Sequence, residues 1–148
     1  MPLPDDAVEA RAQGWRTLAA LHARIEDALE RALQAAHGLS VTEYTVLDVL
    51  AKQDGWHMRM QQLARAVVLS QSATTRLVTR LEKRGLLSRY LCEEDRRGIY
   101  TEVTGPGREL LAEARPTHDT TLTAALDEAV EIPELEPLVR SVQDLTRV

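Results

Sequence analysis

One face of a predicted helix between Ser70 and Gly85 carries side chains that can all donate hydrogen bonds. At about 100° per residue, the side chains that share this face are Ser72, Thr75, Arg76, Thr79 and Lys83. None of them is acidic, whereas a helix face that merely meets solvent usually mixes both charge signs. Phosphate oxygens and the acceptor atoms of base edges bind such donors. The pattern therefore predicts a face that binds nucleic acid.

The same segment has the features of a short amphipathic helix. Ser70 supplies a hydroxyl for the N-cap, and Gly85 follows the last residue of the periodic pattern. The side expected to be buried consists of Ala73, Thr74, Leu77, Val78 and Leu81. The only acidic residue of the helix, Glu82, lies to one side of the donor face.

A larger pattern surrounds this helix. A shorter helix is predicted at 60–68, and two strands are predicted at 86–92 and 99–104. The polar loop between the strands contains Asp95, Arg96, Arg97 and Gly98. This order is typical of a helix-turn-helix followed by a β-hairpin wing, in which one helix enters the major groove and the loop reaches the backbone or the minor groove. Taken alone, the loop also fits a plain charged hairpin tip.

Positive charge is concentrated in this part of the chain. The whole protein has 148 residues and a net charge of −5, from 18 basic and 23 acidic residues. Between Arg59 and Arg97, nine basic residues stand against four acidic ones, so this segment carries +5 and the remainder −10. A basic segment in an acidic body can orient itself on DNA. Charge alone is equally consistent with an ordinary arginine-rich surface.

Composition argues against several other classes of protein. Apolar residues make up 44 %, enough for the core of one domain or of a compact module with dimerisation elements. Two Trp, three Tyr and no Phe are few for a single-strand binder, which stacks bases on aromatic side chains. The single cysteine, Cys92, favours a reducing compartment. Without a signal-peptide pattern or an apolar run of membrane-spanning length, a cytoplasmic protein with no membrane partner is predicted.

Amphipathic helices flank the predicted DNA-binding module. One is predicted at 5–37, and a capping box from Ser40 to Glu43 starts the next. After the wing, Thr104 is expected to cap another helix, which Pro116 should kink or break. Pro133 is expected to open the last helix.

These elements predict a mainly α fold with a small β-hairpin wing. Residues 39–107 are assigned to a winged helix-turn-helix DNA-binding domain, and residues 1–38 and 108–148 to a helical dimerisation region. A winged helix-turn-helix needs only about 60–70 residues for its own core, which leaves the terminal helices available for a partner. Readers of operator DNA are usually two-fold dimers. The alternative is a monomer whose terminal helices pack on its own DNA-binding module.

Three stretches resemble the MarR family of bacterial transcription regulators. They are LSVTEYTVLDVLA (39–51), QLARAVVLSQSATTRLVTRLEKRGLLSR (62–89) and DRRGIYTEVTGPG (95–107). The shared pattern is a leucine-serine-led recognition helix, a Leu-Glu-x-x-Gly-Leu junction, and an Asp-Arg-Arg wing followed by Val-Thr-x-x-Gly. The flanking helices are similar only in layout. One departure is Val67-Val68 in the turn before the recognition helix, where the family commonly has glycine, so a slightly different turn geometry is expected.

The resemblance implies a homodimeric repressor that reads a palindromic operator in double-stranded DNA and often releases it when a small-molecule effector binds. The positions that match the family's DNA-binding motifs are Ser70, Gln71, Ser72, Thr74, Thr75, Arg76, Thr79, Arg80, Asp95, Arg96 and Arg97. Arg76 is expected to contact a base edge, most simply a guanine, and Thr79 and Arg80 to hold phosphates. Arg96 or Arg97 would reach the minor groove, with Asp95 fixing a wing arginine.

Motifs for catalysis or metal binding are not found in the sequence. The four histidines are scattered, and there is no Cys-x-x-Cys or His-x-x-x-His, so neither a metal nor another cofactor is predicted. Without a nucleophile elbow or a phosphate loop, an enzyme is not predicted. Cys92 could sense oxidants, although its acidic neighbours favour a packed thiol. Trp15, Trp56 and His57 could line a ligand pocket, although packing is the simpler interpretation.

One alternative function stays open at this point. A winged-helix module that binds an acidic protein partner, without sequence-specific DNA binding, would show the same basic face. A salt-sensitive complex with DNA distinguishes the two functions.

Overall fold

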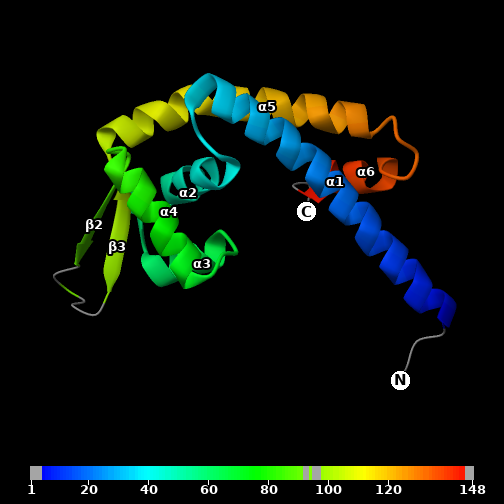
Figure 1. The fold of residues 1–148 in the computed structure, drawn as a ribbon, viewed down its shortest axis with the longest axis horizontal. Coiled ribbons are helices and arrows are strands. Elements are labelled where there is room, and N and C mark those ends of the chain that lie inside the picture. Colours follow the sequence, from blue (N-terminus) through cyan, green and yellow to red (C-terminus); the bar gives the residue numbers. More distant parts are fainter. Residues whose placement is uncertain (1–4, 92–93, 95–97, 146–148) are drawn as a thin grey trace. The chain divides into compact units, whose positions relative to one another are not determined.

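The computed structural model describes residues 5–91, 94 and 98–145, which divide into two compact units (Figure 1). Residues 33–117 form one unit, called here the central unit. Residues 1–32 and 118–148 form the other, called here the terminal unit. Helices dominate, and the sheet is small and antiparallel, so the predicted fold class is confirmed.

The central unit contains a helix-turn-helix and a sheet. Its elements are α2 (Val41–Ala51), η1 (Asp54–Trp56), β1 (His57–Arg59), α3 (Met60–Ala66), α4 (Gln71–Lys83), β2 (Leu87–Leu91) and β3 (Ile99–Val103). The antiparallel β2–β3 pair, with Leu87 opposite Val103 and Leu91 opposite Ile99, is the predicted wing hairpin. β2 begins one residue later and β3 ends one residue earlier than the sequence predicted, and Cys92, the predicted end of the first strand, lies outside the described residues.

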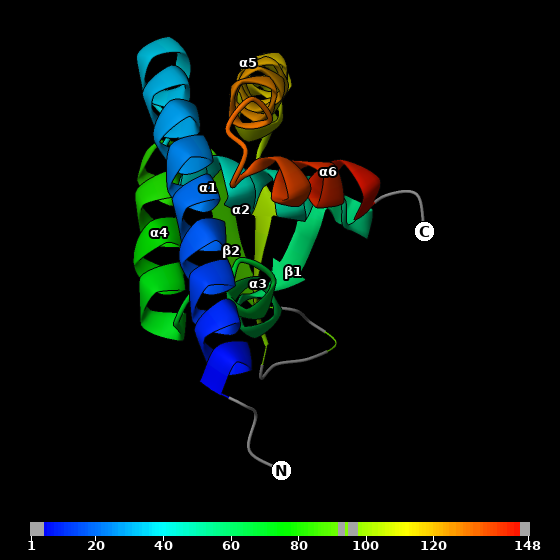
Figure 2. The same ribbon diagram turned by 90° about the vertical axis from the view of Figure 1, so that its right-hand side faces the viewer.

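The sheet has a third strand that the sequence analysis did not predict. β1 pairs antiparallel with β3, which gives the strand order β1-β3-β2 (Figure 2). Three residues are too few to show an alternating pattern, and the strand forms only because β3 supplies its hydrogen-bond partners. β3 therefore lies between β1, which leads into α3, and β2, which follows α4. Both neighbours of β3 connect the wing to the helix-turn-helix.

Local capping explains where the helices of the central unit begin. The predicted capping box of α2 is present, since the Ser40 Oγ accepts the Glu43 N–H at 3.0 Å and the Glu43 Oε1 accepts the Ser40 N–H at 2.9 Å. The Ser70 Oγ accepts the N–H of Ala73 at 3.1 Å and so starts α4. Such caps satisfy backbone donors that the first helical turn leaves unpaired.

The buried face of α4 packs into the core of the central unit. Leu77, Val78 and Leu81 are at most 2 % exposed. They share that core with buried side chains of neighbouring elements, among them Leu47, Leu50, Leu63, Leu86 and Val103. Burial of these side chains at 1.5–3 kcal/mol each, in order of magnitude, fixes α4 in one rotational setting about its axis. The opposite face of α4 is thereby directed to solvent.

Val68 occupies a turn position that favours glycine. α3 ends at Ala66, two residues earlier than predicted. The Leu69 N–H then donates to the Ala64 carbonyl at 3.0 Å and the Val68 N–H to that of Arg65 at 3.3 Å, which is a Schellman motif. The central residue of this motif is left-handed, and Val68 has a φ of 56°. Gly85, in the same place after α4, has a φ of 76° without a Cβ to strain.

Val68→Gly is expected to stabilise the protein by about 1 kcal/mol. The left-handed conformation costs a residue with a Cβ about 1–2 kcal/mol, of which the greater chain entropy of glycine offsets part. The Val68 side chain is 86 % exposed, so its loss removes little packing. Thermal unfolding should show a rise in Tm of a few degrees, about 2–4 °C. The matched control is Val67→Gly, whose φ of −93° suits valine and which should lower Tm.

The terminal unit is helical. It contains most of α1 (Asp5–His37), the second half of α5 (Gly105–Ala129) and α6 (Glu136–Asp144). Its core consists of Leu21, Leu126, Ala129, Leu135 and Val139. No helix in the described ranges is both long and apolar enough to cross a membrane.

Pro116 was expected to kink or break its helix and Pro133 to open the last helix, and both the break at Pro116 and the start at Pro133 were wrong. α5 continues through Pro116 rather than ending there. Proline removes one helical hydrogen bond, to the carbonyl of Ala112, but apolar side chains on both sides, such as Leu111 and Leu126, are buried and hold the helix together. Pro133 does not open the last helix, which begins at Glu136 with Pro137 in its first turn.

Candidate nucleic-acid interface

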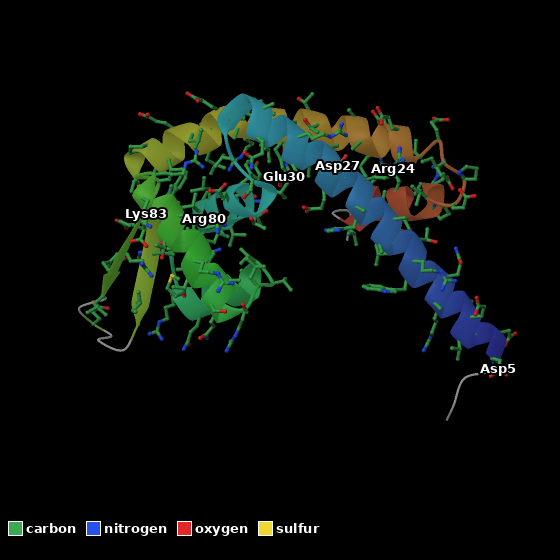
Figure 3. All side chains as sticks on the ribbon, viewed as in Figure 1. Asp5, Arg24, Asp27, Glu30, Arg80 and Lys83 are labelled. Atoms are coloured by element: carbon green, nitrogen blue, oxygen red, sulfur yellow. The ribbon has the colours of Figure 1, made fainter. Side chains whose placement is uncertain are left out.

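The solvent-facing side of α4 carries most of the predicted recognition residues. Gln71, Ser72, Thr75, Arg76 and Arg80 are exposed, as are Ser70 before the helix and Lys83 at its end, and Thr79 is half-buried. Figure 3 shows the side chains of Arg80 and Lys83 on this helix. No acidic residue occurs between Ser70 and Leu81. The face is therefore cationic and rich in hydrogen-bond donors.

The N-terminus of α4 adds to the attraction for anions. The Ser70 hydroxyl caps the Ala73 N–H and lies 3.3 Å from the Ser72 hydroxyl. The first turn contains no acid. Because the helix dipole places partial positive charge at this end, a phosphate there would be stabilised by the backbone and by both hydroxyls.

Thr74 does not belong to this face. Its side chain is 1 % exposed, and its hydroxyl donates to the Ser70 carbonyl at 2.9 Å. The assignment of Thr74 to DNA binding came from the family motif, whereas the helical periodicity had placed it on the buried side. The burial of Thr74 agrees with the helical periodicity and not with the family motif. Its hydrogen bond to Ser70 stabilises the start of α4.

The threonines on the exposed face use their hydroxyl protons within the helix. The Thr75 hydroxyl donates to the Gln71 carbonyl at 2.9 Å, and the Thr79 hydroxyl donates to the Thr75 carbonyl at 2.8 Å. A threonine hydroxyl bonded in this way presents its oxygen as an acceptor and must rotate before it can donate to a phosphate. Arginine side chains are therefore the main donors of the face.

The basic residues of the central unit are not equivalent. Arg84 donates to the Gly38 carbonyl at 2.9 Å and lies 3.3 Å from the Glu43 carboxylate, so it joins the end of α4 to the start of α2. Arg76 and Arg80 form no ion pair or side-chain hydrogen bond with another residue of the described ranges. Their charge is free to meet a ligand.

Arg89 of β2 is bound to two residues of α4. Its Nε lies 2.6 Å from Oε1 of Glu82, and its Nη2 donates to the Thr79 hydroxyl at 3.3 Å. Both charged side chains are about one third exposed or less, 32 % for Arg89 and 26 % for Glu82. The strand that leads into the wing is thus joined directly to the recognition helix.

A hollow of about 290 Å³ separates the start of α4 from the base of the wing. Its lining includes Gln71 and Thr75 from α4 and Arg59, Arg89 and Ile99 from the sheet. The exposed recognition residues Gln71 and Thr75 therefore border this hollow. Cys92 and the predicted wing residues Asp95, Arg96 and Arg97 lie outside the described residues.

A cluster on the other face of the sheet was missed by sequence reasoning. Tyr90 and Tyr100 stack with ring centroids 5.7 Å apart, and His57 lies edge-on to Tyr100 at 5.5 Å. Nδ1 of His57 is hydrogen-bonded to the Tyr90 hydroxyl, and the Arg59 Nε donates to that of Tyr100 at 3.0 Å. The aromatic pair joins β2 to β3, and His57 and Arg59 add β1 to the cluster. The position of Tyr90 and Tyr100 in two paired strands could have indicated their contact.

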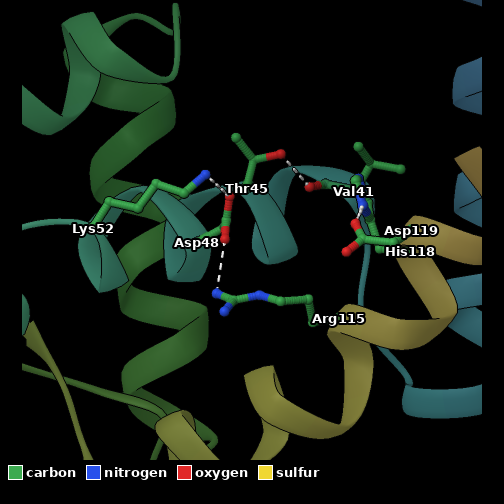
Figure 4. Close-up of polar contacts among 7 residues, drawn as sticks. All are labelled: Val41, Thr45, Asp48, Lys52, Arg115, His118 and Asp119. Carbon is green, nitrogen blue, oxygen red and sulfur yellow. Dashed lines mark hydrogen bonds and ion pairs between the residues drawn. The ribbon is translucent and has the colours of Figure 1, made fainter. Parts of the chain in front are cut away.

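Other contacts hold the ends of the central unit together. Arg115 of α5 donates to Asp48 of α2 at 3.0 Å, and Lys52 binds the other oxygen of Asp48 at 3.0 Å (Figure 4). Burial acts to lower the pKa of Arg115, but its hydrogen bonds with Tyr44 and Asp48 and the Asp48 charge outweigh burial and raise it. Arg115 therefore stays charged, and its ion pair with Asp48 links α5 to α2.

Trp56 stacks against a guanidinium group. The guanidinium carbon of Arg108 lies 4.3 Å from the centre of the Trp56 ring.

Within the described ranges, no three or more His, Cys, Asp or Glu side chains are grouped so that they could hold a metal ion.

A helix-turn-helix with a wing sheet and a cationic, acid-free recognition face defines a winged helix-turn-helix DNA-binding protein. A model of the MarR family matches residues 37–98. The HTH-type transcriptional regulator MhqR of Bacillus subtilis is 30 % identical over 112 residues, which cover 76 % of this chain and 73 % of MhqR. The chain therefore belongs to the MarR family of transcriptional regulators.

Two further comparisons agree with this family. The transcriptional repressor MprA of Escherichia coli K12 is 32 % identical over 81 residues, which cover 55 % of this chain and 46 % of MprA. The crystal structure of Sco3205, a MarR family transcriptional regulator from Streptomyces coelicolor in complex with DNA, superposes with a TM-score of 0.76 and 26 % identity. That superposition covers 99 % of this chain and 89 % of Sco3205.

Proposed function

We propose that the chain is a homodimeric transcriptional repressor that reads a palindromic operator, with α4 in the major groove and the wing on the adjacent minor groove. The observation that carries this proposal is the exposed face of α4, on which Arg76 and Arg80 have no partner in the described structure and no acid intervenes. Its helix-capping serine and its acid-free first turn favour a phosphate at the same end. The protein has no enzymatic role and works where the chromosome is, in the cytoplasm.

Selection of bound duplexes from a random DNA pool tests this function. We expect an enriched inverted repeat whose half-site centres are about one helical turn apart, because two-fold dimers read two-fold sites. Affinity should fall steeply between 50 and 200 mM salt. Failure to enrich any symmetric sequence at moderate salt would contradict the proposal. Recovery of one acidic protein, without a salt-sensitive DNA complex, would support the protein-interaction function instead.

The proposal of a homodimer is supported by apolar side chains that the terminal unit leaves exposed. Val8, Trp15 and Leu18 of α1 are 53 %, 69 % and 45 % exposed, and Val142 of α6 and Leu145 after it are 42 % and 70 % exposed. A monomer rarely leaves large apolar side chains exposed in a group. A second copy of the chain, carrying the same surface, is the partner that an isologous interface needs.

Val142→Glu is expected to weaken the dimer by two orders of magnitude or more. A two-fold interface would bury two copies of the new carboxylate, and an unpaired buried charge costs about 3–5 kcal/mol. Sedimentation equilibrium over a concentration series measures the effect. Ser141→Glu in the same helix is the matched control, because Ser141 is already exposed and polar. Equal dimerisation of the two variants would place the interface elsewhere.

Arg97→Ala tests the role of the wing, which rests on the sequence alone. If Arg97 holds a phosphate, the variant should bind all sequences more weakly, and the slope of log K against log salt should become less steep by about 0.9 per subunit. Asp95→Ala should have a similar effect if the carboxylate fixes the arginine. An unchanged salt slope in Arg97→Ala would remove this residue from the interface.

Support for a small-molecule effector comes from the family resemblance and from a hollow of about 470 Å³ in the terminal unit. That volume lies in the usual range for small-molecule sites. The hollow is lined by side chains of α1 and α5, including Arg24, Asp27, Arg31 and Glu128. Release of the operator by a panel of small phenols, measured by fluorescence anisotropy, tests the proposal.

A further inference from the structure

Glu82 is an acid placed at the edge of a face that is otherwise cationic. It follows Leu81 in α4 and is one residue before Lys83. If α4 faces DNA, a carboxylate at the edge of this face repels phosphates unless a cation neutralises it. The only ion pair of Glu82 in the described structure is with Arg89, at 2.6 Å.

Arg89 is placed to neutralise Glu82 rather than to reach outward. Its Nε forms the ion pair with Glu82 and its Nη2 donates to the Thr79 hydroxyl, so the edge of the guanidinium group that carries Nε and Nη2 is directed at α4. It lies in β2 opposite Thr101, whose side chain is fully buried, so the Arg89 side chain leaves the sheet on the side that packs against the helices. Arg76 and Arg80, by contrast, have no such partners in the described residues.

We propose that Arg89 shields Glu82 from DNA, as a positioning residue that keeps the recognition face cationic without itself contacting a phosphate. This inference rests on the proposed function, because it matters only if α4 faces DNA. It assigns to the pair a role different from that of Arg76 and Arg80. It also explains how an acid is tolerated at the end of the recognition helix.

Substitutions that remove charge distinguish shielding of Glu82 by Arg89 from direct contact between Arg89 and a phosphate. In Arg89→Gln, the Glu82 carboxylate loses its cation, and affinity for the selected operator and for unrelated duplex should both fall, by roughly tenfold or more at 0.1 M salt. In the double variant Glu82→Gln/Arg89→Gln no acid remains to be shielded. Its affinity should return to within about threefold of the wild type, with a wild-type salt slope.

Each outcome supports or overturns the proposal. A double variant as weak as Arg89→Gln, with a salt slope reduced by about 0.9 per subunit, would show that Arg89 contacts phosphate directly. Wild-type affinity in Arg89→Gln would show that the carboxylate does not affect DNA. A wild-type protein without a salt-sensitive DNA complex would overturn the proposed function itself, and this inference with it.

Two controls remove the remaining ambiguities. Lys83→Gln and Glu82→Gln/Lys83→Gln change the same number of charges next to the pair, and their effects should be additive because Lys83 has no ion pair with Glu82. Arg89→Lys keeps the charge and should bind nearly as the wild type does.

If Arg89→Gln does not fold, as judged by thermal unfolding, the single variant Glu82→Gln tests the proposal instead. Freed Arg89 should then give tighter binding to unrelated duplex with a steeper salt slope, and an unchanged slope overturns the proposal.

Discussion

Arg76→Ala is expected to abolish discrimination between the operator and unrelated DNA while leaving the fold intact. Each bidentate contact of arginine with guanine contributes about 1–3 kcal/mol of discrimination, and a dimer makes the contact twice. The specificity ratio should therefore fall by about 2–6 kcal/mol, which is up to four orders of magnitude. Arg76 is exposed and has no partner in the described residues, so the melting temperature should not change. Fluorescence anisotropy with operator and scrambled duplexes at two salt concentrations measures the ratio.

Arg76→Lys is the matched variant for this prediction. It keeps the charge but replaces a planar fork by a point charge, so a base-reading role predicts a loss of specificity nearly as large as that of alanine. If Arg76 serves only as a phosphate contact, lysine should restore both affinity and specificity. That result would move the base-reading role to another side chain of the face.

Gly107→Ala is expected to destabilise the protein by about 3 kcal/mol, near the upper end of the usual range for overpacking. A Cβ on Gly107 would lie 2.3 Å from the carbonyl oxygen of Leu86 and 2.7 Å from Cγ1 of Val103. The first of these neighbours is backbone and cannot turn away as a side chain can. Urea unfolding monitored by circular dichroism measures the change in unfolding free energy.

Gly105→Ala provides the control for Gly107→Ala. It lies two residues earlier in the first turn of α5, and a Cβ there would meet no atom within 4 Å. Alanine restricts the unfolded chain more than glycine does, so this variant should be neutral or stabilised by a few tenths of a kcal/mol. Equal destabilisation by both substitutions would show that the loss does not come from contact of the new Cβ with Leu86 and Val103.

Helix caps could be predicted from the sequence, whereas the pairing of distant segments could not. The caps at Ser40 and Ser70 depend on residues three positions away, and the structure has both as predicted. β1, in contrast, exists only through its pairing with β3, more than forty residues later. The three residues of β1 are too few to show a pattern from which the strand could be predicted.

The same division applies to the candidate interface. Helical periodicity identified the exposed face of α4, and burial placed Thr74 where periodicity had placed it rather than where the family motif had. From the sequence, the nine basic residues between Arg59 and Arg97 could only be treated as one positively charged segment. Only the structure separates Arg84 and Arg89, whose partners include Glu43 and Thr79, from Arg76 and Arg80, which have no side-chain partner among the described residues.

Pro116 has a consequence for how the two compact units are connected. The division between the units in α5 falls between Thr117 and His118, next to this proline. Because Pro116 has no N–H, the Ala112 carbonyl has no helical bond to lose when α5 bends there. α1 crosses the division between Ala32 and Leu33 without such a gap. Of these two connecting helices, α5 is therefore the one in which a bend costs least.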